Sequence, residues 1–527
     1  MSAGSLSPGP LVVSLLPRSF GALGQALEGG ACSGADVVEL RLDHLAGEIR
    51  REPGGLRSLV ERAGRPVIAA VHGREGFGAF AGDIGERREL LHAAASAGVS
   101  RVDVDERFVR EIGELGVARI ISTHRAAETA AELDALAARL DALAEPGRDL
   151  VKVAPAAGTA AHGLRLLRWL AQRDPETTVA ISTGAAGSFT RLLAPAFGGV
   201  LTFAAPAPVE GVDLALAAPG QLLVDHVRAV WAGGAPSTET DVALVCGDPI
   251  GHSAGPVVHG AALAATGVDG VLAPTLASPV EALGLGPRLV GLSVTAPYKV
   301  DAMELVGEAS AAARAIGALN TIEVGVGRAE RGSNSDAPAI RAALEASGVE
   351  LRGAAALVVG AGGAARAAVH ALREAGASVT VAARRVEAAA EFAGDRAVSL
   401  DALGDLDALG TPGGEAPAVI VHATPLGSAG SGEAPVPRAL LTPGVTVLDA
   451  VYRPRRTGLL RLAASLGAET VEGSEWFLQQ AWLQHLRIFR QGYAARYGAA
   501  GPPAAVATAA AAAMGSALDA WLEGDAR

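Results

Sequence analysis

The sequence predicts an α/β protein in which a (β/α)8 barrel is followed by a two-domain α/β unit. Two patterns in the chain support this prediction. Short β-type runs alternate with helical stretches over about the first 230 residues, and a strand, a glycine-rich turn and a helix follow one another after about residue 346. At about 150 residues per domain, a chain of 527 residues has room for two to four domains.

The first half contains strand candidates with helical sequence between them. Eight βα units in this length favour a barrel, and an open doubly wound sheet is the alternative. We assign residues 1–232 to the barrel and the small, turn-rich residues 233–240 to a linker. The expected strands are Leu11–Leu16, Asp36–Asp43, Pro66–His72, Arg101–Asp105, Arg119–Thr123, Leu150–Ala154, Thr178–Thr183 and Gly199–Ala205.

The second half begins a new βαβ pattern at Asp241. We assign residues 241–345 to a substrate-binding domain and residues 346–473 to a nucleotide-binding domain, whose first strands are Ala354–Val359 and Ser378–Ala383. Residues 474–527 are expected to form helices that return to the substrate-binding domain. Their alanine-rich part, 503–514, is expected to be a helix packed on the surface.

Composition and charge narrow the class of protein. A net charge of −12 without a basic stripe argues against nucleic acid as a partner. The sequence contains no uninterrupted run of about 20 apolar residues, so it predicts no membrane span. Its first residues do not resemble a signal peptide. Cys32 and Cys246 match no metal-ligand spacing. We therefore expect buried free thiols, no metal, small-molecule partners and a cytoplasmic location, with the oligomeric state left open.

Lys152 and Lys299 are the only lysines, although lysine and arginine together number 44. A guanidinium stays charged, whereas a desolvated amine can become a nucleophile or pass on a proton. Arginine-biased codon usage could leave two lysines by chance. The interpretation that we favour is one active site in each half of the chain.

Lys152 and His124 lie where a barrel collects reactive groups, at the carboxyl ends of strands. Burial would lower the pKa of Lys152 and make it a candidate Schiff-base nucleophile toward a ketone. His124 ends the preceding strand as a candidate acid–base group. A lone histidine there is more often structural, but beside a solitary lysine within a strand the acid–base role is favoured. An arginine at such a position can clamp a carboxylate or form a simple ion pair. The other polar residues at strand ends are Ser14, Glu39, Arg41 and Arg191.

These residues belong to motifs that follow one another in order between residues 11 and 230. The motifs are Val37-Val-Glu-Leu-Arg-Leu-Asp43, Ser122-Thr-His124, Asp149-Leu-Val-Lys152, Ser188-Phe-Thr-Arg191 and Ala218-Pro-Gly-Gln221. They resemble the type I 3-dehydroquinate dehydratases. The resemblance implies a (β/α)8 barrel in which Lys152 forms an imine with the C3 ketone of 3-dehydroquinate. It makes His124 the general base that removes the C2 proton. The residues implied to hold the hydroxyls and carboxylate are Glu39, Arg41, Arg191 and Gln221, with Ser14 a weaker candidate.

Two positions depart from that pattern. His72 follows the third strand where an arginine is usual, and Ala217 stands where serine is common. We expect Arg74 to take over the role of the missing arginine. These changes bear on substrate affinity more than on the reaction.

A glycine-rich turn between a strand and a helix predicts a dinucleotide-binding site in the second half. Glycines allow the tight turn, and the helix N-terminus favours a pyrophosphate. The next strand ends in Arg384 and Arg385, without the acid that would hold the ribose hydroxyls of NAD. We therefore expect NADP(H), and ordinary charges at a helix start are the alternative. The turn consists of Gly360, Ala361, Gly362, Gly363 and Ala364.

A second set of motifs extends over about residues 242–520. It comprises Gly247-Asp-Pro-Ile-Gly-His-Ser253, Ser293-Val-Thr-Ala-Pro-Tyr-Lys299, Gly317-Ala-Leu-Asn-Thr321, Gly332-Ser-Asn-Ser-Asp336, His422-Ala-Thr-Pro-Leu-Gly427, Tyr452, Gly473 and Gln480. The set resembles shikimate dehydrogenases. The resemblance implies that Lys299 and Asp336 form a catalytic pair that protonates an alkoxide as hydride arrives from NADPH. Without it, the two residues would be only a candidate ion pair.

The same resemblance implies the contacts around that pair. The substrate carboxylate would be bound by Ser253 and Tyr452, the ring hydroxyls by Thr295, Asn320 and Gln480, and the cofactor also by Thr424 and Gly473. Three positions depart from the pattern: Gly255 replaces a second serine, and His422 and Ser293 stand where asparagine is usual or common. The preference for shikimate over quinate is therefore left open.

The two sets of motifs predict consecutive reactions on one chain. Dehydration of 3-dehydroquinate gives 3-dehydroshikimate, and reduction of that product gives shikimate. We expect a bifunctional enzyme of aromatic amino-acid precursor synthesis. The alternatives are a catabolic enzyme that acts on quinate with NAD, and a metabolite-sensing regulator whose active sites are dead. The presence of Lys152, His124, Lys299 and Asp336 argues against the regulator.

Overall fold

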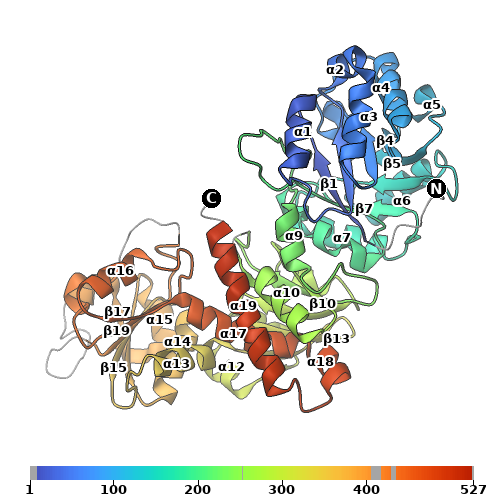
Figure 1. Cartoon of the computed structure of the whole chain (residues 1–527). Helices are drawn as coiled ribbons and strands as arrows, with labels where there is room; N and C mark the ends of the chain where they lie inside the picture. Colours follow the sequence, from blue (N-terminus) through green and yellow to red (C-terminus); the bar gives the residue numbers. More distant parts are fainter. Residues whose placement is uncertain (1–8, 252, 405–416, 429–434, 525–527) are drawn as a thin grey trace. The chain divides into compact units, whose positions relative to one another are not determined.

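The computed structural model describes residues 9–251, 253–404, 417–428 and 435–524. They form two compact units that divide near residue 242, with residues 269–277 and 284–286 grouped with the first unit. In Figure 1 the first unit is blue to green, and the second unit continues to red at the C-terminus.

The first unit is built on an eight-stranded parallel sheet in the order β7-β6-β5-β4-β3-β2-β1-β8. A backbone hydrogen bond of 3.0 Å from Val200 to Thr178 joins the segment before β8 to the start of β7. The sheet is therefore nearly closed, which confirms the predicted barrel and excludes the open doubly wound sheet. The strands are β1 (Leu11–Leu15), β2 (Val37–Arg41), β3 (Val67–Ala70), β4 (Arg101–Asp105), β5 (Ala118–Thr123), β6 (Leu150–Val153), β7 (Thr178–Ala180) and β8 (Thr202–Ala204).

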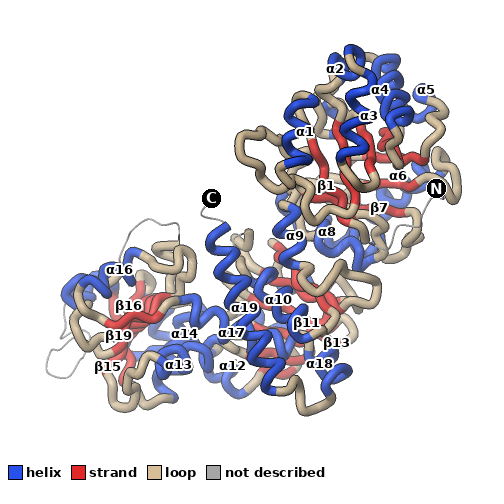
Figure 2. The backbone as a smooth tube through the Cα atoms, in the orientation of Figure 1, coloured by secondary structure: helices blue, strands red, loops and turns tan. Residues whose placement is uncertain are grey.

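Helices connect the barrel strands and cover the sheet from outside (Figure 2). Two of them, α4 (Ile84–Ala97) and α6 (Ala130–Asp141), start with capping boxes in which Asp83 and Thr129 bond the backbone of a glutamate three residues on. The others are α1 (Phe20–Glu28), α2 (Ala46–Arg51), α3 (Pro53–Arg62), α5 (Val109–Ile112), α7 (Ala160–Leu170), α8 (Thr190–Leu193) and α9 (Val224–Val230).

Side chains alternate in direction along each barrel strand, so that some polar side chains point into the barrel. In β2 all five residues are buried, although the strand contains Glu39 and Arg41. Residues two apart on a strand point to the same side, so these two side chains share one face. Buried polar groups persist only where they have partners. The charged face of β2 therefore marks a site inside the barrel.

After residue 240 the chain forms a six-stranded mixed sheet in the order β10-β9-β11-β13-β14-β12, of which strand β10 is grouped with the first unit. Its antiparallel pairs are β11 with β13 and β13 with β14. The strands are β9 (Asp241–Cys246), β10 (Gly270–Thr275), β11 (Leu289–Val294), β12 (Glu308–Ala309), β13 (Thr321–Gly325) and β14 (Arg328–Ser333). The helices are α10 (Gly255–Thr266), α11 (Pro279–Leu283), α12 (Ala311–Ile316) and α13 (Asp336–Ala346).

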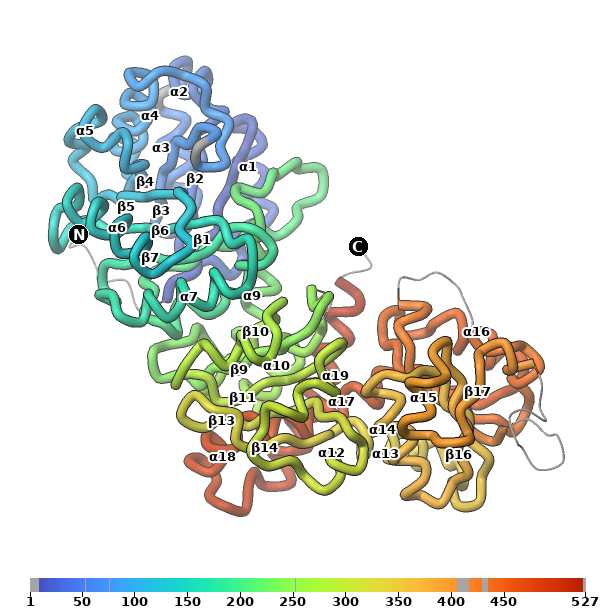
Figure 3. The backbone as a smooth tube through the Cα atoms, turned by 180° about the vertical axis from the view of Figure 1, so that it is seen from behind, coloured from blue at the N-terminus to red at the C-terminus, as the bar shows by residue number. Residues whose placement is uncertain are grey.

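A six-stranded parallel sheet follows in the order β17-β16-β15-β18-β19-β20. By chain order this is 3-2-1-4-5-6, the Rossmann arrangement, which confirms the predicted nucleotide-binding fold. Figure 3 shows α14 and α15 against the β16 part of this sheet. The strands are β15 (Ala355–Val359), β16 (Ser378–Ala383), β17 (Ala397–Ser399), β18 (Val419–His422), β19 (Thr446–Asp449) and β20 (Glu469–Val471), and the helices are α14 (Gly363–Glu374), α15 (Val386–Ala393) and α16 (Gly458–Ser465).

The C-terminal helices are α17 (Gly473–Ile488), α18 (Arg490–Tyr497) and α19 (Ala504–Gly524). Helix α17 packs on β11 and β13, and α19 packs along α10. By length and composition α19 could cross a membrane. In the structure it packs by one face, through the buried residues Ala510, Met514 and Leu518, as expected for a helix on the protein surface.

Both cysteines are buried and free. Burial raises the pKa of the Cys32 thiol to about 11, and it raises the pKa of Cys246 as well. The two thiols are therefore protonated at neutral pH and pack as small apolar side chains.

Candidate active sites

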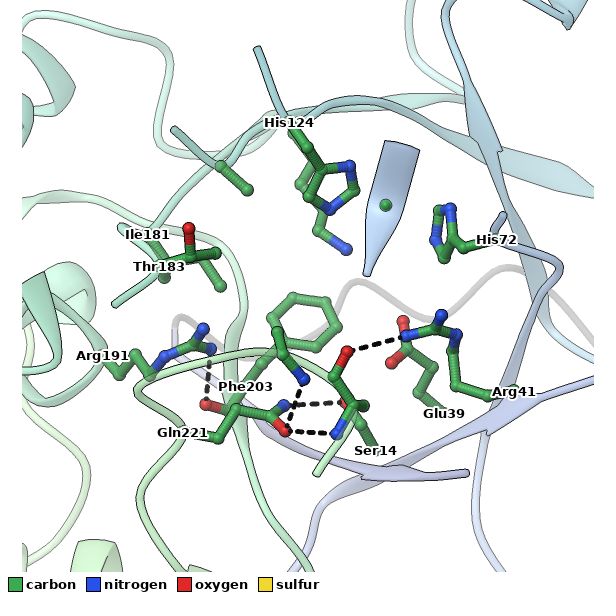
Figure 4. Close-up of a pocket in the computed structure, with 15 residues that line it drawn as sticks. Ser14, Glu39, Arg41, His72, His124, Ile181, Thr183, Arg191, Phe203 and Gln221 are labelled. Atoms are coloured by element: carbon green, nitrogen blue, oxygen red, sulfur yellow. Dashed lines mark hydrogen bonds between the residues drawn. The ribbon is translucent and has the colours of Figure 1, made fainter. Parts of the chain in front are cut away.

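A pocket lies at the carboxyl ends of the barrel strands and gathers the polar residues predicted for the first half (Figure 4). Its polar lining comes from almost every part of the barrel. The lining residues are Ser14, Glu39, Arg41, His72, Gly76, His124, Lys152, Ala154, Ile181, Thr183, Arg191, Phe203, Ala217, Ala218 and Gln221.

Lys152 is buried on β6 and paired with a carboxylate from β4. Its Nζ donates to Asp103 Oδ2 at 2.7 Å, and it lies 4.4 Å from the centroid of the Phe203 ring. The hydroxyl of Ser122 donates to the other oxygen of Asp103 at 2.5 Å. Asp103 was not among the predicted site residues. Because both its oxygens are engaged, it fixes the direction of the lysine side chain.

His124 directly follows β5 and lies beside Lys152 in the pocket. Burial, and next the charge of Lys152, lower the pKa of His124 to about 4. Its Nδ1 has no hydrogen-bond partner in the described part of the chain. A neutral imidazole with a free nitrogen is able to accept a proton at neutral pH.

His72, and not Arg74, occupies the place of the arginine expected after β3. The His72 ring is buried, lies edge-on to the His124 ring at 5.3 Å, and has its Nε2 3.7 Å from Asp103 Oδ1. Burial and the charge of Arg41 hold the pKa of His72 well below its ordinary value. Arg74 begins a short 3-10 helix, η1 (Arg74–Gly76), with its side chain exposed and outside the pocket lining. In the structure His72, and not Arg74, therefore lines the pocket.

Arg41 is held in place by Asp43 and the backbone of Ala217. Its Nη2 donates to Asp43 Oδ2 at 2.7 Å, and its Nη1 donates to the carbonyl of Ala217 at 3.1 Å. The same carboxylate of Asp43 accepts the backbone N–H of His72 at 3.1 Å. Asp43 thus connects the guanidinium of β2 to the loop after β3.

Arg191 is a buried cation without a carboxylate partner among the described residues. It is 1% exposed, donates from Nη1 to the carbonyl of Phe203 at 3.1 Å, and leaves its Nε unpartnered. Burial lowers its pKa to about 10, opposed by the charge of Glu39. A guanidinium in this state has donors available for a ligand carboxylate.

Gln221 and Ser14 close the other side of the pocket. The amide oxygen of Gln221 accepts the backbone N–H groups of Ala217 and Ala218 at 3.1 and 3.2 Å. Its amide nitrogen donates to Ser14 Oγ at 3.4 Å. Ala217 therefore takes part through its backbone, so the loop keeps its contacts without a serine side chain.

The second unit contains a larger pocket that gathers all five substrate residues predicted for the second half. It includes the departures Gly255 and Ser293. The predicted residues in its lining are Ser253, Thr295, Lys299, Asn320, Asp336, Ala364, Tyr452, Gly473 and Gln480.

Lys299 and Asp336 form an ion pair in this pocket, with Nζ 2.6 Å from Oδ2. Their side chains are 15% and 5% exposed. Asp336 is the first residue of α13, where the helix dipole favours a negative charge. The Lys299 ammonium is thus both stabilised by a carboxylate and open to the pocket.

The amide residues beside the pair form one hydrogen-bonded group. Asn320 Nδ2 donates to Ser335 Oγ at 2.9 Å and to Gln480 Oε1 at 3.3 Å. Gln484 Nε2 donates to the carbonyl of Asn320 at 2.6 Å. Ser335 and Gln484 were not predicted from the sequence. They hold Asn320 and Gln480 in orientations that face the pocket.

Ser253 and Tyr452 meet at the start of α10. The Tyr452 hydroxyl accepts from the backbone N–H of Ala254 at 3.4 Å, and the Gly255 N–H donates to Ser253 Oγ at 3.2 Å. Burial raises the pKa of Tyr452, which keeps its hydroxyl protonated. Two hydroxyl donors beside backbone N–H groups can bind a carboxylate.

The glycine-rich turn lies directly against Lys299. A Cβ atom on Gly363 would come within 2.8 Å of Lys299 Cβ, and one on Gly360 would come within 2.8 Å of the carbonyl oxygen of Ala423. Gly362, the N-cap of α14, faces open space. The turn therefore leaves room for a pyrophosphate at the start of α14, which fits a dinucleotide.

The remaining predicted cofactor residues follow strands of the same sheet. Arg384 and Arg385 are exposed directly after β16, and Thr424 follows β18. Gly473 opens α17, where a Cβ atom would come within 2.5 Å of the carbonyl oxygen of Asp449.

Comparisons with known proteins cover both halves. The family model of type I 3-dehydroquinase matches residues 11–232, and that of the shikimate dehydrogenase substrate binding domain matches residues 245–322. The chain is 31% identical over 487 residues to the bifunctional 3-dehydroquinate dehydratase/shikimate dehydrogenase, chloroplastic, of Arabidopsis thaliana, which covers 86% of this chain and 77% of that protein. The chain belongs to this bifunctional family.

Further similarities concern the dehydrogenase half. The shikimate dehydrogenase (NADP(+)) of Halobacterium salinarum is 43% identical over 246 residues, 46% of this chain and 90% of that protein. A crystal structure of shikimate 5-dehydrogenase from Thermus thermophilus in complex with NADP(H) and shikimate is 32% identical, with a TM-score of 0.42, and covers 52% of this chain and 99% of that one.

The bifunctional dehydratase/dehydrogenase thus joins a lyase and an oxidoreductase of the shikimate pathway, which confirms the predicted function. The residues that sequence reasoning missed, Asp103, Ser335 and Gln484, all act on a predicted residue from a neighbouring element. Two features of the sequence could have indicated them. Charged residues alternate along β4 and include Asp103, and a second glutamine, Gln484, follows Gln480 by one helical turn.

The lowered pKa of His124 can be tested by NMR. Because burial and the charge of Lys152 disfavour the imidazolium, we expect the ring to remain neutral between about pH 5 and 8, the range in which an ordinary histidine titrates. A His124→Gln variant assigns the resonance. A titration midpoint near the ordinary value of about 6.5 would contradict the described environment.

Proposed function

We propose that each half of the enzyme works through its one lysine, held beside a carboxylate in its own pocket. Lys152 pairs with Asp103 and Lys299 with Asp336. This placement of the chain's two amines is the observation that carries the proposal. The first amine serves as a nucleophile and the second as a proton donor.

In the dehydratase half, the Lys152 amine attacks the C3 ketone of 3-dehydroquinate and forms an imine with loss of water. Asp103 positions Nζ and takes a proton from the ammonium before the attack, so that the free amine is the nucleophile. His124, neutral at physiological pH, removes the C2 proton, and the imine accepts the electron pair. Protonated His124 then assists departure of the hydroxyl as water, and hydrolysis of the imine releases 3-dehydroshikimate.

The charged residues of the barrel pocket orient this substrate. Arg191 binds the carboxylate, supported by its burial without a carboxylate partner among the described residues. Glu39 and Arg41 contact ring hydroxyls from the shared face of β2, and Gln221 and Ser14 complete the enclosure. His72 is a neutral neighbour of Asp103, which supports weaker substrate affinity than an arginine would give.

Borohydride trapping tests the nucleophile. Reduction of the imine should attach substrate covalently to the native chain and leave Lys152→Ala unlabelled. Lys152→Arg should remain unlabelled too, because guanidinium does not lose its proton. Mass spectrometry of the labelled peptide locates the adduct. Labelling of the Lys152→Ala chain at another position would exclude Lys152 as the Schiff-base residue.

In the dehydrogenase half, Lys299 and Asp336 hold and transfer the proton. NADPH, when bound, supplies hydride to the C3 carbonyl carbon of 3-dehydroshikimate. The Lys299 ammonium gives a proton to the oxygen that becomes the hydroxyl, and Asp336 keeps Nζ in place while solvent restores the proton. Ser253 and Tyr452 bind the carboxylate, and Thr295, Asn320 and Gln480 bind ring hydroxyls.

Substitution of Lys299 separates the two activities. For Lys299→Arg we expect a loss in kcat of about 10²- to 10⁴-fold for reduction, the range of general acid catalysis, with a smaller change in KM. Dehydration of 3-dehydroquinate by the same chain should be unchanged, which controls for folding. Asp336→Asn should lower kcat less, because the amide still accepts a hydrogen bond. Equal losses in both activities would contradict the division of roles.

We propose NADP(H) as the cofactor, bound by Gly360–Ala364 at the pyrophosphate and by Arg384 and Arg385 at the 2′-phosphate. The two exposed arginines after β16 support this, as do the NADP-dependent relatives. Thr424 and Gly473 lie at the same edge of the sheet. No metal takes part in the proposed chemistry.

Arg384→Ala tests the 2′-phosphate contact. Loss of a charge-assisted hydrogen bond should raise KM for NADPH about 10- to 100-fold and leave KM for NADH nearly unchanged. Arg352→Ala, at the other end of the sheet before β15, is the matched control. Equal effects on both cofactors would show that Arg384 does not contact the phosphate. The same assay with quinate and shikimate distinguishes the biosynthetic from the catabolic preference.

We also propose the domain boundaries 1–232, 233–240, 241–345, 346–473 and 474–527. The matched ranges 11–232 and 245–322 and the packing of α17 on β11 and β13 support them. A cytoplasmic location is supported by the buried free thiols. Shikimate and NADP are the small-molecule ligands named for a related structure.

A further inference from the structure

A hydrogen-bonded chain of three polar side chains, two of them buried, lies at the carboxyl ends of β18 and β19. The strands pair in register so that His422 stands beside Asp449. His422 Nδ1 lies 2.9 Å from Asp449 Oδ1, and its Nε2 is hydrogen-bonded to the hydroxyl of Thr424. His422 and Asp449 are 0% and 1% exposed. His422 is also the residue that replaces the asparagine usual in shikimate dehydrogenases.

The partners of Asp449 determine which ring nitrogen carries hydrogen. The carboxylate accepts the Val451 N–H at 3.0 Å and the Thr457 hydroxyl at 2.6 Å. A carboxylate offers only acceptors, so His422 must place its N–H on Nδ1, toward Asp449. The ring nitrogen Nε2 on the other side is hydrogen-bonded to the Thr424 hydroxyl. The contacts of Asp449 therefore fix the orientation of the ring, and the ring in turn holds the Thr424 hydroxyl in place.

Thr424 lies beside the dinucleotide turn. Its Cγ2 is 3.3 Å from the position of a Cβ atom on Gly360, the first glycine of the turn. Thr424 Oγ1 also accepts the Leu426 N–H at 3.3 Å. Since β15 and β18 are neighbours where the strand order reverses, Thr424 stands at the edge where Rossmann domains bind dinucleotides.

We infer that His422, held by Asp449, is a positioning residue that holds the Thr424 hydroxyl at the edge of the sheet where the dinucleotide binds. The hydroxyl, fixed by the ring and by the Leu426 N–H, then forms a hydrogen bond with the bound dinucleotide. The carboxamide of a nicotinamide, which offers both a donor and an acceptor, is the chemical group that suits this contact. The inference rests on the proposed binding of NADP(H) by this domain.

Asparagine and glutamine separate the two contacts of the ring. In His422→Asn the amide can replace Nδ1 and keep Asp449, but it is too short to reach Thr424. In His422→Gln the amide oxygen can replace Nε2 and keep Thr424, while Asp449 retains Val451 and Thr457. A role in packing alone would make both substitutions similar.

The experiment combines these variants with Thr424→Val, which removes the hydroxyl, and Thr424→Ser, which keeps it. The readouts are the dissociation constant of NADPH, from titration of the protein fluorescence, and the kcat and KM of reduction. The rate of 3-dehydroquinate dehydration by each chain, together with circular dichroism, controls for folding.

We expect His422→Asn to raise the NADPH dissociation constant about three- to tenfold, the range of one hydrogen bond, with a smaller effect on kcat. His422→Gln should raise it less. The effect of His422→Asn should disappear in the Thr424→Val background and persist in the Thr424→Ser background, because the two residues then act through one hydroxyl.

Two outcomes overturn the inference while the wild-type chain binds NADPH. One is an unchanged dissociation constant in His422→Asn, and the other is the same fold-change in the Thr424→Val background as in the wild type. A wild-type chain that reduces 3-dehydroshikimate without binding NADPH would instead overturn the proposed cofactor.

Discussion

The need to balance a buried amine with a carboxylate is the constraint on which both active sites depend. An ammonium group removed from water is strongly destabilised unless a counter-charge and hydrogen bonds compensate it. Asp103 meets this need from two strands away in the barrel, and Asp336 meets it from the first turn of a helix. The positions of β4 and α13 relative to the lysines are therefore part of the chemistry. The same pairing also aims each amine into its pocket.

Periodicity predicted the barrel strands and the first two strands of the nucleotide-binding sheet, but it could not predict contacts between side chains on different strands. The eight barrel strands were all expected, but Gly199–Ala205 and Thr178–Thr183 shorten to Thr202–Ala204 and Thr178–Ala180. The end residues of these two predicted strands are not part of β7 and β8, and two of those that follow β7 line the pocket instead. Asp103 looked like an ordinary charge in an alternating strand, because its proximity to Lys152 arises only when β4, β5 and β6 pair in register. Arg74, in the short turn after β3, is exposed and lies outside the pocket lining.

The departures from family patterns differ in what they change. At Ala217 the backbone contacts Arg41 and Gln221, so the identity of the side chain matters little to that loop. At His72 an uncharged ring stands where a cation is usual, which leaves Arg41 and Arg191 as the cations that line the pocket besides Lys152. At Gly255 the loss of a hydroxyl leaves Ser253 and Tyr452 as the donors beside the helix start. Of these three departures, only the one at Ala217 leaves the electrostatics of its pocket unchanged.

The close approach of Gly363 to Lys299 limits how far the nucleotide-binding domain can be treated as an interchangeable module. A Cβ atom at Gly363 would occupy the space of the lysine stem, at 2.8 Å from its Cβ. A turn grafted from another Rossmann domain with alanine there would push the amine away from Asp336. Recombination of this enzyme with foreign cofactor domains is therefore constrained by a steric fit at the catalytic residue, independent of how well the new domain binds its nucleotide.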